Sequence, residues 1–405
     1  MTRVIPLFVP DVDAEDFRLV HEVLTSRRLA SGSVAERFEL EFAARFGVRH
    51  AIAVSSGTAA LHLAIIAAGV RENDLVLTTP YSFVASSNAI LYERGIPLFV
   101  DIDPVTLDLS PAKTCEAIET LVQRRAGWQL LLPRTCNASA NTLRAVLPVH
   151  LFGRPAELRD IVALSRRHAI PVLEDACEAL GARIDGELAG SWGSAATFGF
   201  YPNKQITSGE GGMLVTNDDA WMRLFRSLRN QGRAADPDAL RYERLGFNYR
   251  MDELSAALGL AQLRRLDTLL QRRESVARRY ARLLANVDGI SPLAAPRRGM
   301  TVSWFLYVIR LAPDIDRDRL RTRLAARGIA SQPYFWPIHL QPFYVERFGF
   351  REGDFPNAEA AGRSLLALPF GPNLSDDDVA YVCDAVIEEL EQCRETAPLA
   401  RCEPR

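Results

Sequence analysis

Lysine is almost absent from this chain, since all but two of its 48 basic residues are arginine. An arginine guanidinium stays protonated, whereas a lysine amine can lose its proton when it is desolvated and then act as a nucleophile. The two lysines are Lys113, which stands in a polar and irregular stretch, and Lys204, which closes the run Phe198 to Lys204. Lys204 is therefore the candidate for chemistry that arginine cannot perform.

An excess of charge of either sign is missing as well. The formal net charge is −2 and no stretch collects positive charge, so non-specific binding to nucleic acid or to an anionic membrane has no electrostatic basis. The amino terminus lacks an apolar signal core, and the apolar run 60–70 is too short to span a bilayer. We expect small-molecule substrates, no nucleic acid partner and no membrane insertion.

Cysteine motifs typical of metal sites are also missing. The six cysteines form no CxxC pair, and none stands at zinc-ligand spacing with a histidine. We therefore expect no metal site, and we interpret the cysteines as reduced thiols of a cytoplasmic protein.

Short β-branched runs alternate with helical patterns between about residues 49 and 212, which is typical of an α/β domain with a mostly parallel sheet. The predicted strands are 51–54, 75–78, 97–101, 147–150 and 171–175. Ser55, Tyr81, His150 and Asp175 stand where predicted strands end or shortly after. Ligands of such sheets bind at the carboxyl ends of the strands, so these positions mark the expected site.

A second, smaller domain is predicted after the first. Residues 252–285 form a long helical pattern that would bridge to it, and a strand at 303–309 and a helix at 317–327 follow. We predict a large α/β domain over 1–251 and a bridging helix with a small α+β domain over 252–405. Residues 112–144 show poor periodicity, and we interpret them as a surface insertion without an assigned function.

The segment Ser55–Leu61 lies between a predicted strand and an apolar helix. The N–H groups of Gly57, Thr58 and Ala59 would then point out of a helix amino terminus, a geometry that binds phosphate. An ordinary helix cap by serine or threonine explains the same residues equally well.

Asp175 follows an apolar run and would bring a carboxylate from a buried strand to the ligand edge. Such a carboxylate needs a cationic partner, which either an arginine or a pyridinium nitrogen can supply. A phosphate-binding helix start, an acid and a later lysine are together the three parts that a pyridoxal phosphate enzyme needs.

Six ordered motifs carry a family resemblance from about Ile5 to Leu374. They resemble those of the DegT/DnrJ/StrS family of sugar aminotransferases, and they are Ser56–Leu61, Pro80–Ala85, Val149–Gly153, Glu174–Ala176, Lys204–Gly212 and Gly246–Met251. The resemblance implies a fold type I homodimer with pyridoxal 5′-phosphate at the subunit interface. It also implies a ping-pong transfer of an amino group, usually from L-glutamate, to a keto group of a nucleotide-linked sugar.

The resemblance assigns roles to single residues. Lys204 would form the internal aldimine and then move the proton, which needs an amine that can lose its charge. Asp175 would pair with the pyridine nitrogen, and Phe83 would stack on the ring, although a plain core position is the alternative for Phe83. Gly57, Thr58 and Ala59 would hold the phosphate. Asn248 would reach the cofactor phosphate of the other subunit, unless it is only a turn residue.

Two positions depart from the family pattern. Glu178 stands where the family usually has Gln or His against the cofactor hydroxyl, and a carboxylate near Asp175 would be repelled unless it is protonated or paired. Gly199 stands where a serine usually contacts the phosphate, so this contact is lost or passes to Asn203 or a backbone N–H.

The residues around Lys204 narrow the expected reaction. Family members that remove a sugar hydroxyl carry histidine in place of the lysine, so Lys204 argues against them. The run Thr207–Gly212 resembles enzymes that act on 4-keto sugars and on cyclitols, which favours a 4-keto-6-deoxy sugar nucleotide. A keto-cyclitol or 3-keto sugar acceptor is the alternative, and a non-catalytic binding or regulatory protein on the same fold is an alternative of another class.

The segment Tyr334–Tyr344 resembles the part of the small domain that lines the substrate side of the site. Tyr334 and His339 are therefore candidate substrate contacts, since an aromatic and histidine cluster suits a nucleotide or sugar face. The competing interpretation places most of these side chains, His339 included, in the small-domain core.

Overall fold

Seven strands form the central sheet of the large domain. The computed structural model describes residues 3–136, 142–234, 241–293 and 295–394. Along the sheet the order is β3, β2, β4, β5, β8, β9, β1, where two parallel bridges, Val146 to Val172 and Val149 to Asp175, join β4 to β5. The bounds are β1 His50–Val54, β2 Leu75–Thr78, β3 Ile96–Phe99, β4 Leu143–Leu147, β5 Leu173–Asp175, β8 Ala195–Gly199 and β9 Gly212–Thr216.

Strand β9 pairs antiparallel with both of its neighbours, β1 and β8, whereas the other described strands of this sheet run in one common direction. The sheet is therefore mostly parallel, as predicted, and the α/β fold class of the large domain is confirmed. One predicted strand is displaced, because β4 ends at Leu147, where residues 147–150 were expected to form the strand.

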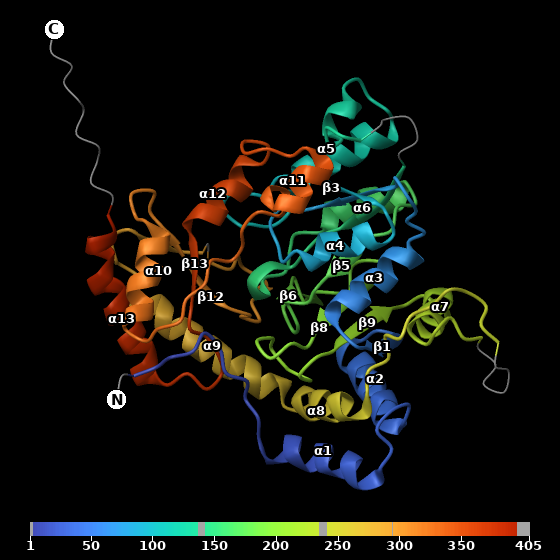
Figure 1. Ribbon diagram of the computed structural model, residues 1–405, viewed down its shortest axis with the longest axis horizontal. Helices are drawn as coiled ribbons and strands as arrows, with labels where there is room; N and C mark the ends of the chain where they lie inside the picture. The colour runs from blue at the N-terminus through green and yellow to red at the C-terminus, as the bar shows by residue number, and fades with distance from the viewer. Residues whose placement is uncertain (1–2, 137–141, 235–240, 294, 395–405) are drawn as a thin grey trace.

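Alternating side chains of the strands pack on two layers of helices. In β9, Leu214 packs with α3 (Gly57–Ala67) and α7 (Asp219–Arg229), while Met213 and Val215 pack with α2 (Ser33–Phe46) and α8 (Glu253–Arg264). This is the two-residue period of a β-strand with both faces covered. Further helices of this domain are α1 Ala14–Ser26, α4 Ala85–Tyr92, α5 Pro111–Val122 and α6 Arg159–Arg167, as seen in Figure 1.

Residues 112–122 differ from the sequence prediction, which placed them in a surface insertion over 112–144. They lie in α5, and its buried residues Thr114, Ala117, Ile118 and Leu121 recur at helical spacing. This helix packs on α6 and is the crossover between the parallel strands β3 and β4. The additional piece is therefore shorter and lies after α5, where the short helix η1 (Trp128–Leu131) is found.

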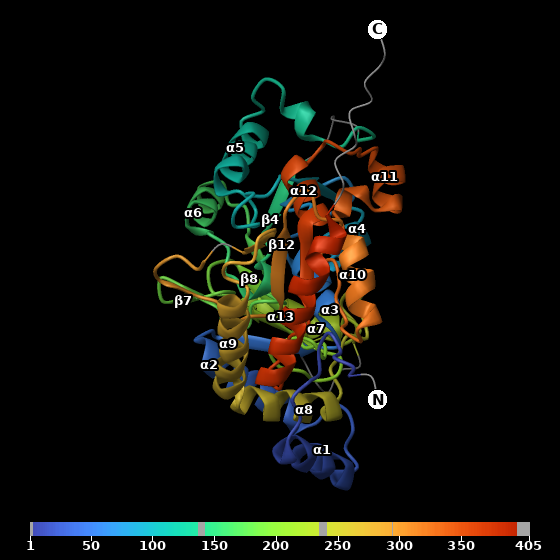
Figure 2. The ribbon, with the colours of Figure 1, turned by 90° about the vertical axis from the view of Figure 1, so that its left-hand side faces the viewer.

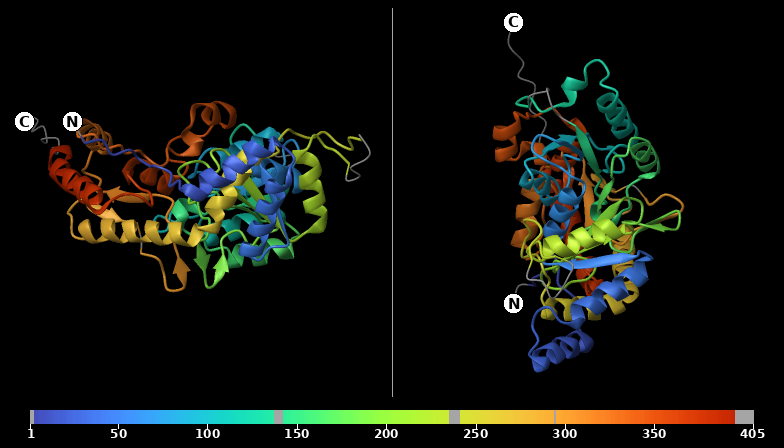
Figure 3. Two further views of the ribbon diagram at one scale, coloured as in Figure 1. Left: turned by 90° about the horizontal axis from the view of Figure 1, so that it is seen from below. Right: turned by 90° about the vertical axis from the view of Figure 1, so that its right-hand side faces the viewer.

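The helical pattern over 252–285 is two helices rather than one. Helix α8 ends at Arg264 and α9 spans Leu266–Leu283, with a bend at Arg265 (Figures 1 and 3). At this bend the Arg265 guanidinium forms ion pairs with Asp11 and Asp16. These ion pairs join the bend between α8 and α9 to the amino-terminal segment.

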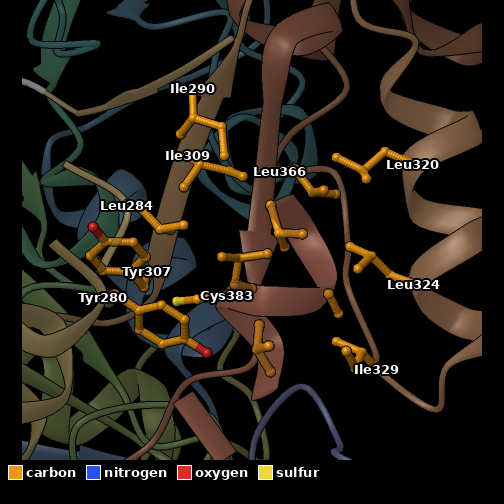
Figure 4. Close-up of a cluster of buried hydrophobic side chains, with 14 of the residues drawn as sticks. Tyr280, Leu284, Ile290, Tyr307, Ile309, Leu320, Leu324, Ile329, Leu366 and Cys383 are labelled. Carbon is orange, nitrogen blue, oxygen red and sulfur yellow. The ribbon is translucent and has the colours of Figure 1, made fainter. Parts of the chain in front are cut away.

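The second domain is built on a three-stranded antiparallel sheet. Its strands are β10 (Ile290–Pro292), β12 (Tyr307–Leu311) and β13 (Leu365–Leu368). Its core is shown in Figure 4 and holds residues of α9, α10 (Arg317–Ala326) and α13 (Asp376–Leu390). The remaining elements are β6 Arg183–Ile184, β7 Glu187–Leu188, β11 Met300–Thr301, α11 Pro342–Phe348, α12 Pro356–Ser364, η2 Leu151–Gly153, η3 Ile338–Leu340 and η4 Glu391–Cys393.

The start of the chain lies with this second domain, although the sequence prediction placed it in the first. Ile5 forms a parallel bridge with Ile329 and is 2% exposed within the same hydrophobic cluster as α10 and α13. Figure 2 shows the amino-terminal end beside the red helix α13. Residues near both ends of the chain thus build one core.

None of the helices in the described ranges is long and apolar enough to cross a membrane.

Candidate active site

A cavity of about 470 Å³ opens at the carboxyl ends of β5 and β8. Of the predicted site residues it gathers Gly57, Thr58, Phe83, Asp175, Glu178, Lys204 and Tyr334. Two larger cavities, of about 640 and 790 Å³, hold none of the predicted site residues. The side chains that line this cavity, rather than its volume, therefore identify it as the candidate active site.

Lys204 projects from the loop that follows β8. Its main chain is held by its own N–H, which donates to the Tyr201 carbonyl at 2.9 Å, and by Arg273, whose Nη2 donates to the Lys204 carbonyl at 2.6 Å. The side chain is 14% exposed, and Nζ lies 3.5 Å from Oε1 of Glu178. Nζ also lies 3.9 Å from the centroid of the Phe305 ring. The amine is thus positioned inside the cavity and has one carboxylate beside it.

Asp175 ends β5 and is 5% exposed. Ser86 donates its hydroxyl to Oδ2 at 2.6 Å, and the Cys177 N–H donates to Oδ1 at 3.1 Å. Both donors are neutral, and among the described residues no lysine, arginine or histidine forms an ion pair with Asp175. This arrangement fits a cationic group in the cavity, such as a protonated ring nitrogen.

The amino terminus of α3 opens into the same cavity, but one of its three predicted donors is already used. Ser56 caps the helix, and its hydroxyl oxygen accepts the Ala59 N–H at 3.0 Å. Ala59 does not line the cavity. The capping interpretation of this motif therefore holds for Ala59, and the phosphate contact stays a prediction for the N–H groups of Gly57 and Thr58, which line the cavity.

Gly57 and Gly199 pack directly against each other. A Cβ atom on Gly57 would lie 3.2 Å from Cα of Gly199 and 3.0 Å from Sγ of Cys177. A Cβ atom on Gly199 would meet Cys177 and Gly57 only at ordinary contact distances of 3.5 to 3.9 Å. The close approach thus requires glycine at position 57, whereas the missing serine at position 199 is not a matter of space.

Glu178 lies 5% exposed beside Lys204. Its Oε2 accepts the Phe152 N–H at 3.0 Å, which leaves Oε1 facing the amine. Burial raises the pKa of the Glu178 carboxyl, and Lys204 opposes that rise. The repulsion from Asp175 that was expected for this position is thus offset by pairing with Lys204.

Phe83 is 58% exposed at the cavity wall, which rules out the plain core position in this chain. Its ring centroid lies 6.3 Å from that of Phe335. Phe335 in turn stacks on Phe152, with centroids 5.9 Å apart and planes 14° apart. A free aromatic face is available for a planar ligand ring.

Tyr334 lines the cavity, whereas His339 does not. Burial raises the pKa of the Tyr334 hydroxyl to about 12, so this group is neutral at physiological pH. His339 is fully buried and its Nε2 lies 3.0 Å from Oε1 of Glu359. The structure therefore buries His339, and the rings of Phe350 and Phe355 that it contacts belong to the hydrophobic cluster on β2 and β3 of the large domain rather than to the small-domain core. Burial lowers the pKa of His339.

Asn248 is exposed and lies outside the cavity of its own chain. It forms an antiparallel bridge with Asn230, in the segment between α7 and α8 that extends to the right in Figure 1. Its expected contact with the cofactor of another subunit stays a prediction.

Two supporting residues escaped the sequence analysis. Ser86, in the first turn of α4, holds Asp175, and its place three residues after Phe83 was the available signal. Arg273 of α9 donates to the carbonyls of Lys204 and Trp304 while it is itself buried. Nothing in the sequence distinguishes Arg273 from the many other arginines.

Among the described residues no group of three His, Cys, Asp or Glu side chains could hold a metal ion, and the five cysteines described are free thiols. The cavity instead combines a nucleophilic amine, an unpaired carboxylate and two N–H groups at a helix start. These are the groups that pyridoxal phosphate requires for its carbonyl, its ring nitrogen and its phosphate.

Comparisons with known proteins agree with this site. The model of the DegT/DnrJ/EryC1/StrS aminotransferase family matches residues 10–387. The GDP-perosamine synthase of Caulobacter vibrioides is 38% identical over 394 residues, covering 96% of this chain and 98% of that protein. The spore coat polysaccharide biosynthesis protein SpsC of Bacillus subtilis is 35% identical over 395 residues, covering 94% and 96%.

Solved structures of the family share the fold. DesV of S. venezuelae superposes with a TM-score of 0.83 at 33% identity, covering 96% of this chain and 99% of DesV. The family match, the fold type I architecture and the residues of the cavity lead to one assignment. This chain belongs to the DegT/DnrJ/EryC1/StrS aminotransferase family, and its cofactor is pyridoxal 5′-phosphate.

Proposed function

We propose that this aminotransferase transfers an amino group from an amino acid, expected to be L-glutamate, to a nucleotide-linked 4-keto-6-deoxy sugar. The observation that carries the proposal is the convergence of Lys204, Asp175 and the start of α3 on one cavity. The similarity to a GDP-perosamine synthase supports a nucleotide-linked sugar as acceptor. We also propose, as expected from the sequence, that the protein is cytoplasmic.

Pyridoxal phosphate, when bound, supplies the electron sink that allows an amino group to leave one substrate and be given to another. Lys204 would hold the cofactor covalently and then carry a proton at the reacting carbon. Asp175, oriented by Ser86, would pair with the ring nitrogen. The Gly57 and Thr58 N–H groups would bind the phosphate.

Cofactor spectroscopy tests the donor half of the proposal. The purified protein should be yellow with pyridoxal phosphate and should bleach on addition of L-glutamate. Colour that persists with glutamate would contradict this donor. The Lys204→Arg variant keeps the charge and should fold, but it should lose the imine absorbance and about 10²–10⁴-fold in rate, the usual contribution of a positioned acid-base group.

An acceptor panel tests the other half. The pyridoxamine form should react with nucleotide 4-keto-6-deoxy sugars in preference to 3-keto sugars and keto-cyclitols. Preference for either of the latter would select the alternative acceptor. Absence of turnover with every acceptor, despite bound cofactor, would favour a non-catalytic binding or regulatory protein.

We further propose a homodimer in which Asn248 reaches the cofactor phosphate of the second subunit. Light scattering should then give twice the chain mass of 45.0 kDa. Mixing Lys204→Arg with Asn248→Ala subunits should restore activity, because a mixed dimer contains one site in which both residues are intact. If Asn248 acts within its own chain, every site in the mixture lacks one residue and no activity returns.

A further inference from the structure

Arg273 of α9 is a buried cation that hydrogen-bonds only main-chain oxygens among the described residues. It is 4% exposed, and burial lowers its pKa to about 10, which still leaves the guanidinium charged at physiological pH. Asp11 is the carboxylate whose charge acts on it, and Asp11 itself forms ion pairs with Arg265 and Arg272. A buried charge costs folding free energy unless hydrogen bonds or an opposite charge offset it, so the carbonyls around Arg273 account for its place.

The two terminal nitrogens of Arg273 contact different segments of the chain. Nη1 donates to the carbonyls of Trp304 at 3.2 Å and Phe305 at 3.3 Å. Nη2 donates to the carbonyl of Lys204 at 2.6 Å and, more weakly, to that of Asn203 at 3.5 Å. Each of these nitrogens carries two hydrogens in the plane of the guanidinium, so one side chain can serve all four carbonyls. Arg273 thus joins the loop after β8 of the large domain to the segment before β12 of the small domain.

The four carbonyls lie outside the strands that flank them. Strand β8 ends at Gly199 and β12 begins at Tyr307, so these oxygens take no part in a β-ladder and need another donor. Trp304 also has a positive φ of 47°, a backbone conformation that is unfavourable for a bulky residue and is retained only where its surroundings hold it. The guanidinium therefore stabilises main-chain conformations that the local sequence does not favour.

The same two segments meet again inside the cavity. The centroid of the Phe305 ring lies 3.9 Å from Nζ of Lys204. Both residues line the cavity, whereas Arg273 does not. A second hydrogen bond, from Nε2 of Gln205 to Oγ of Ser303 at 2.9 Å, also joins these segments and should keep them together in a variant without the guanidinium. The place of the amine relative to the Phe305 ring thus depends on main chain that Arg273 holds.

We propose that Arg273 is a positioning residue whose guanidinium holds the Lys204 segment against the Trp304–Phe305 segment and so sets the place of the Lys204 amine in the cavity. Arg273 touches no reacting atom and acts through the main chain of residues 203–204 and 304–305. The functional meaning rests on the proposed role of Lys204 as the amine that binds the cofactor. Because α9 packs into the cores of both domains, the placement of the amine then depends on how the small domain is docked.

Stopped-flow absorbance after mixing pyridoxal phosphate with the cofactor-free full-length chain separates association from imine formation, in which the Lys204 amine adds to the cofactor aldehyde and water leaves. Imine formation at saturating cofactor should be about 10²-fold slower in Arg273→Met, since a misplaced group loses rate on this scale. The cofactor concentration that gives half of the maximal rate should change little, because the hydrogen bonds of Arg273 do not reach Asp175 or the start of α3. Arg273→Lys keeps the charge but places one nitrogen where two are needed, so it should be slow as well.

Small cations added to Arg273→Met distinguish the shape of the guanidinium from its charge. Millimolar methylguanidine carries the same planar donors and should restore most of the lost rate. Methylammonium carries the charge without the two terminal nitrogens and should restore little. Arg317→Met is the matched control, since Arg317 is 9% exposed and donates to the Gly362 carbonyl but does not contact the Lys204 segment. It should lower thermal stability and leave the rate of imine formation unchanged.

Amide hydrogen exchange of the cofactor-free chain provides an arm that needs no reaction. Exchange should be faster in residues 201–206 and 303–306 of Arg273→Met, and methylguanidine should slow it again, whereas Arg317→Met should leave both segments unchanged. Wild-type imine formation in both Arg273 variants, or unchanged exchange in these segments, would overturn the proposal. So would equal rescue by methylammonium, or equal slowing in Arg317→Met, because charge or overall stability would then explain the effect. A wild type that forms no imine would instead contradict the proposed function, and hydrogen exchange would still decide whether Arg273 holds the two segments.

Discussion

Single side chains connect the two domains at the cavity, and Tyr81 is the clearest case. Its hydroxyl accepts the Phe335 N–H at 2.9 Å and donates to the Tyr334 carbonyl. Tyr81 follows β2 in the large domain, whereas Tyr334 and Phe335 belong to the chain beyond β12. One buried hydroxyl therefore positions the aromatic segment against the site.

Tyr81→Phe should destabilise the protein by about 1–3 kcal/mol, because a buried N–H and a buried carbonyl lose their partner. It should also weaken cofactor binding, which absorbance titration with pyridoxal phosphate can measure. Tyr344→Phe is the matched control, because this tyrosine is equally buried and donates to Asn88, which does not line the cavity, whereas Tyr334 and Phe335, the partners of Tyr81, do line it. Equal loss of cofactor affinity in both variants would show that Tyr81 acts only through stability.

At the residue scale, the sequence predicted the groups suited to the proposed chemistry and missed those that hold them. Lys204 and Asp175, which line one cavity, were predicted because amine and carboxylate chemistry restricts the residue type. Ser86 and Arg273 were missed because their roles are hydrogen bonds to residues 89 and 69 positions away in the chain. His339 was assigned to the substrate because its burial against Glu359 depends on a fold of residues 338–359 that no local pattern reveals.

Helix α3 shows how an element supplies both stability and binding. Ser56 satisfies the Ala59 N–H, and the two preceding residues, Gly57 and Thr58, line the cavity at the helix start. The helix is buried along most of its length between the sheet and α7. Its position is thus set by packing, and its free donors are set by the cap.

Ser56→Ala should cost about 0.5–2 kcal/mol of stability through loss of the cap. Because the cap also orients the Gly57 and Thr58 N–H groups, the affinity for pyridoxal phosphate should fall as well. Asp218→Ala is the matched control, since Asp218 caps α7 by accepting the Ala220 and Trp221 N–H groups away from the cavity. It should lower stability by a similar amount and leave cofactor affinity unchanged, and an equal drop in affinity would contradict the role of Ser56.

The segment after α5 forms hydrogen bonds with residues at the end of α11 and just after it. Arg134 donates to Asp354 through both terminal nitrogens, at 2.5 and 2.6 Å, and Thr135 donates to the Arg347 carbonyl at 2.7 Å. The hydrogen bond from Arg134 lowers the pKa of Asp354. The segment around Arg134, which the sequence analysis treated as a surface insertion, is therefore held next to α11.

Arg134→Gln should reduce stability only slightly, because an ion pair whose arginine is solvent-exposed contributes little to folding. Since the folded Asp354 has a lowered pKa, its contribution is fully present above about pH 4 and is lost only as the pH falls through the folded value. Urea unfolding of the wild type and the variant should thus differ by a constant amount from pH 5 to 8. The control Arg347→Gln removes a neighbouring charge without touching the pair, and a difference that grew between pH 5 and 8 would argue against this assignment.

At the scale of the whole molecule, the amino-terminal segment contacts both domains. Ile5 packs into the small-domain core, Leu7 accepts the Phe370 N–H at 2.8 Å, and Arg265 joins Asp11 and Asp16 to the bend between α8 and α9. The segment around Ile5 thus belongs to the small domain, the chain then forms the large domain, and the remaining elements of the small domain follow. Movement of the small domain relative to the cavity is restrained by this segment.

Ile5→Ala should destabilise the small domain by about 2–5 kcal/mol, because it empties a fully packed position. Thermal unfolding followed by calorimetry should show a lower transition temperature for this domain. Val4→Ala is the matched control, since Val4 is 74% exposed and its truncation should have little effect. Equal effects of the two substitutions would mean that the segment is not docked as described.

By itself the sequence determined the family, the α/β class and the order of the family motifs, and it predicted which amine is reactive. These properties depend on residue chemistry and on local periodicity, which a linear pattern records. The tertiary structure decided which helix donors stay free after the Ser56 cap, that residues 111–122 are a crossover helix, and that Glu178 faces Lys204. It also decided that His339 is core and that Ile5 belongs to the second domain. These outcomes depend on contacts between residues far apart in the chain, and their energies exist only once the chain is folded.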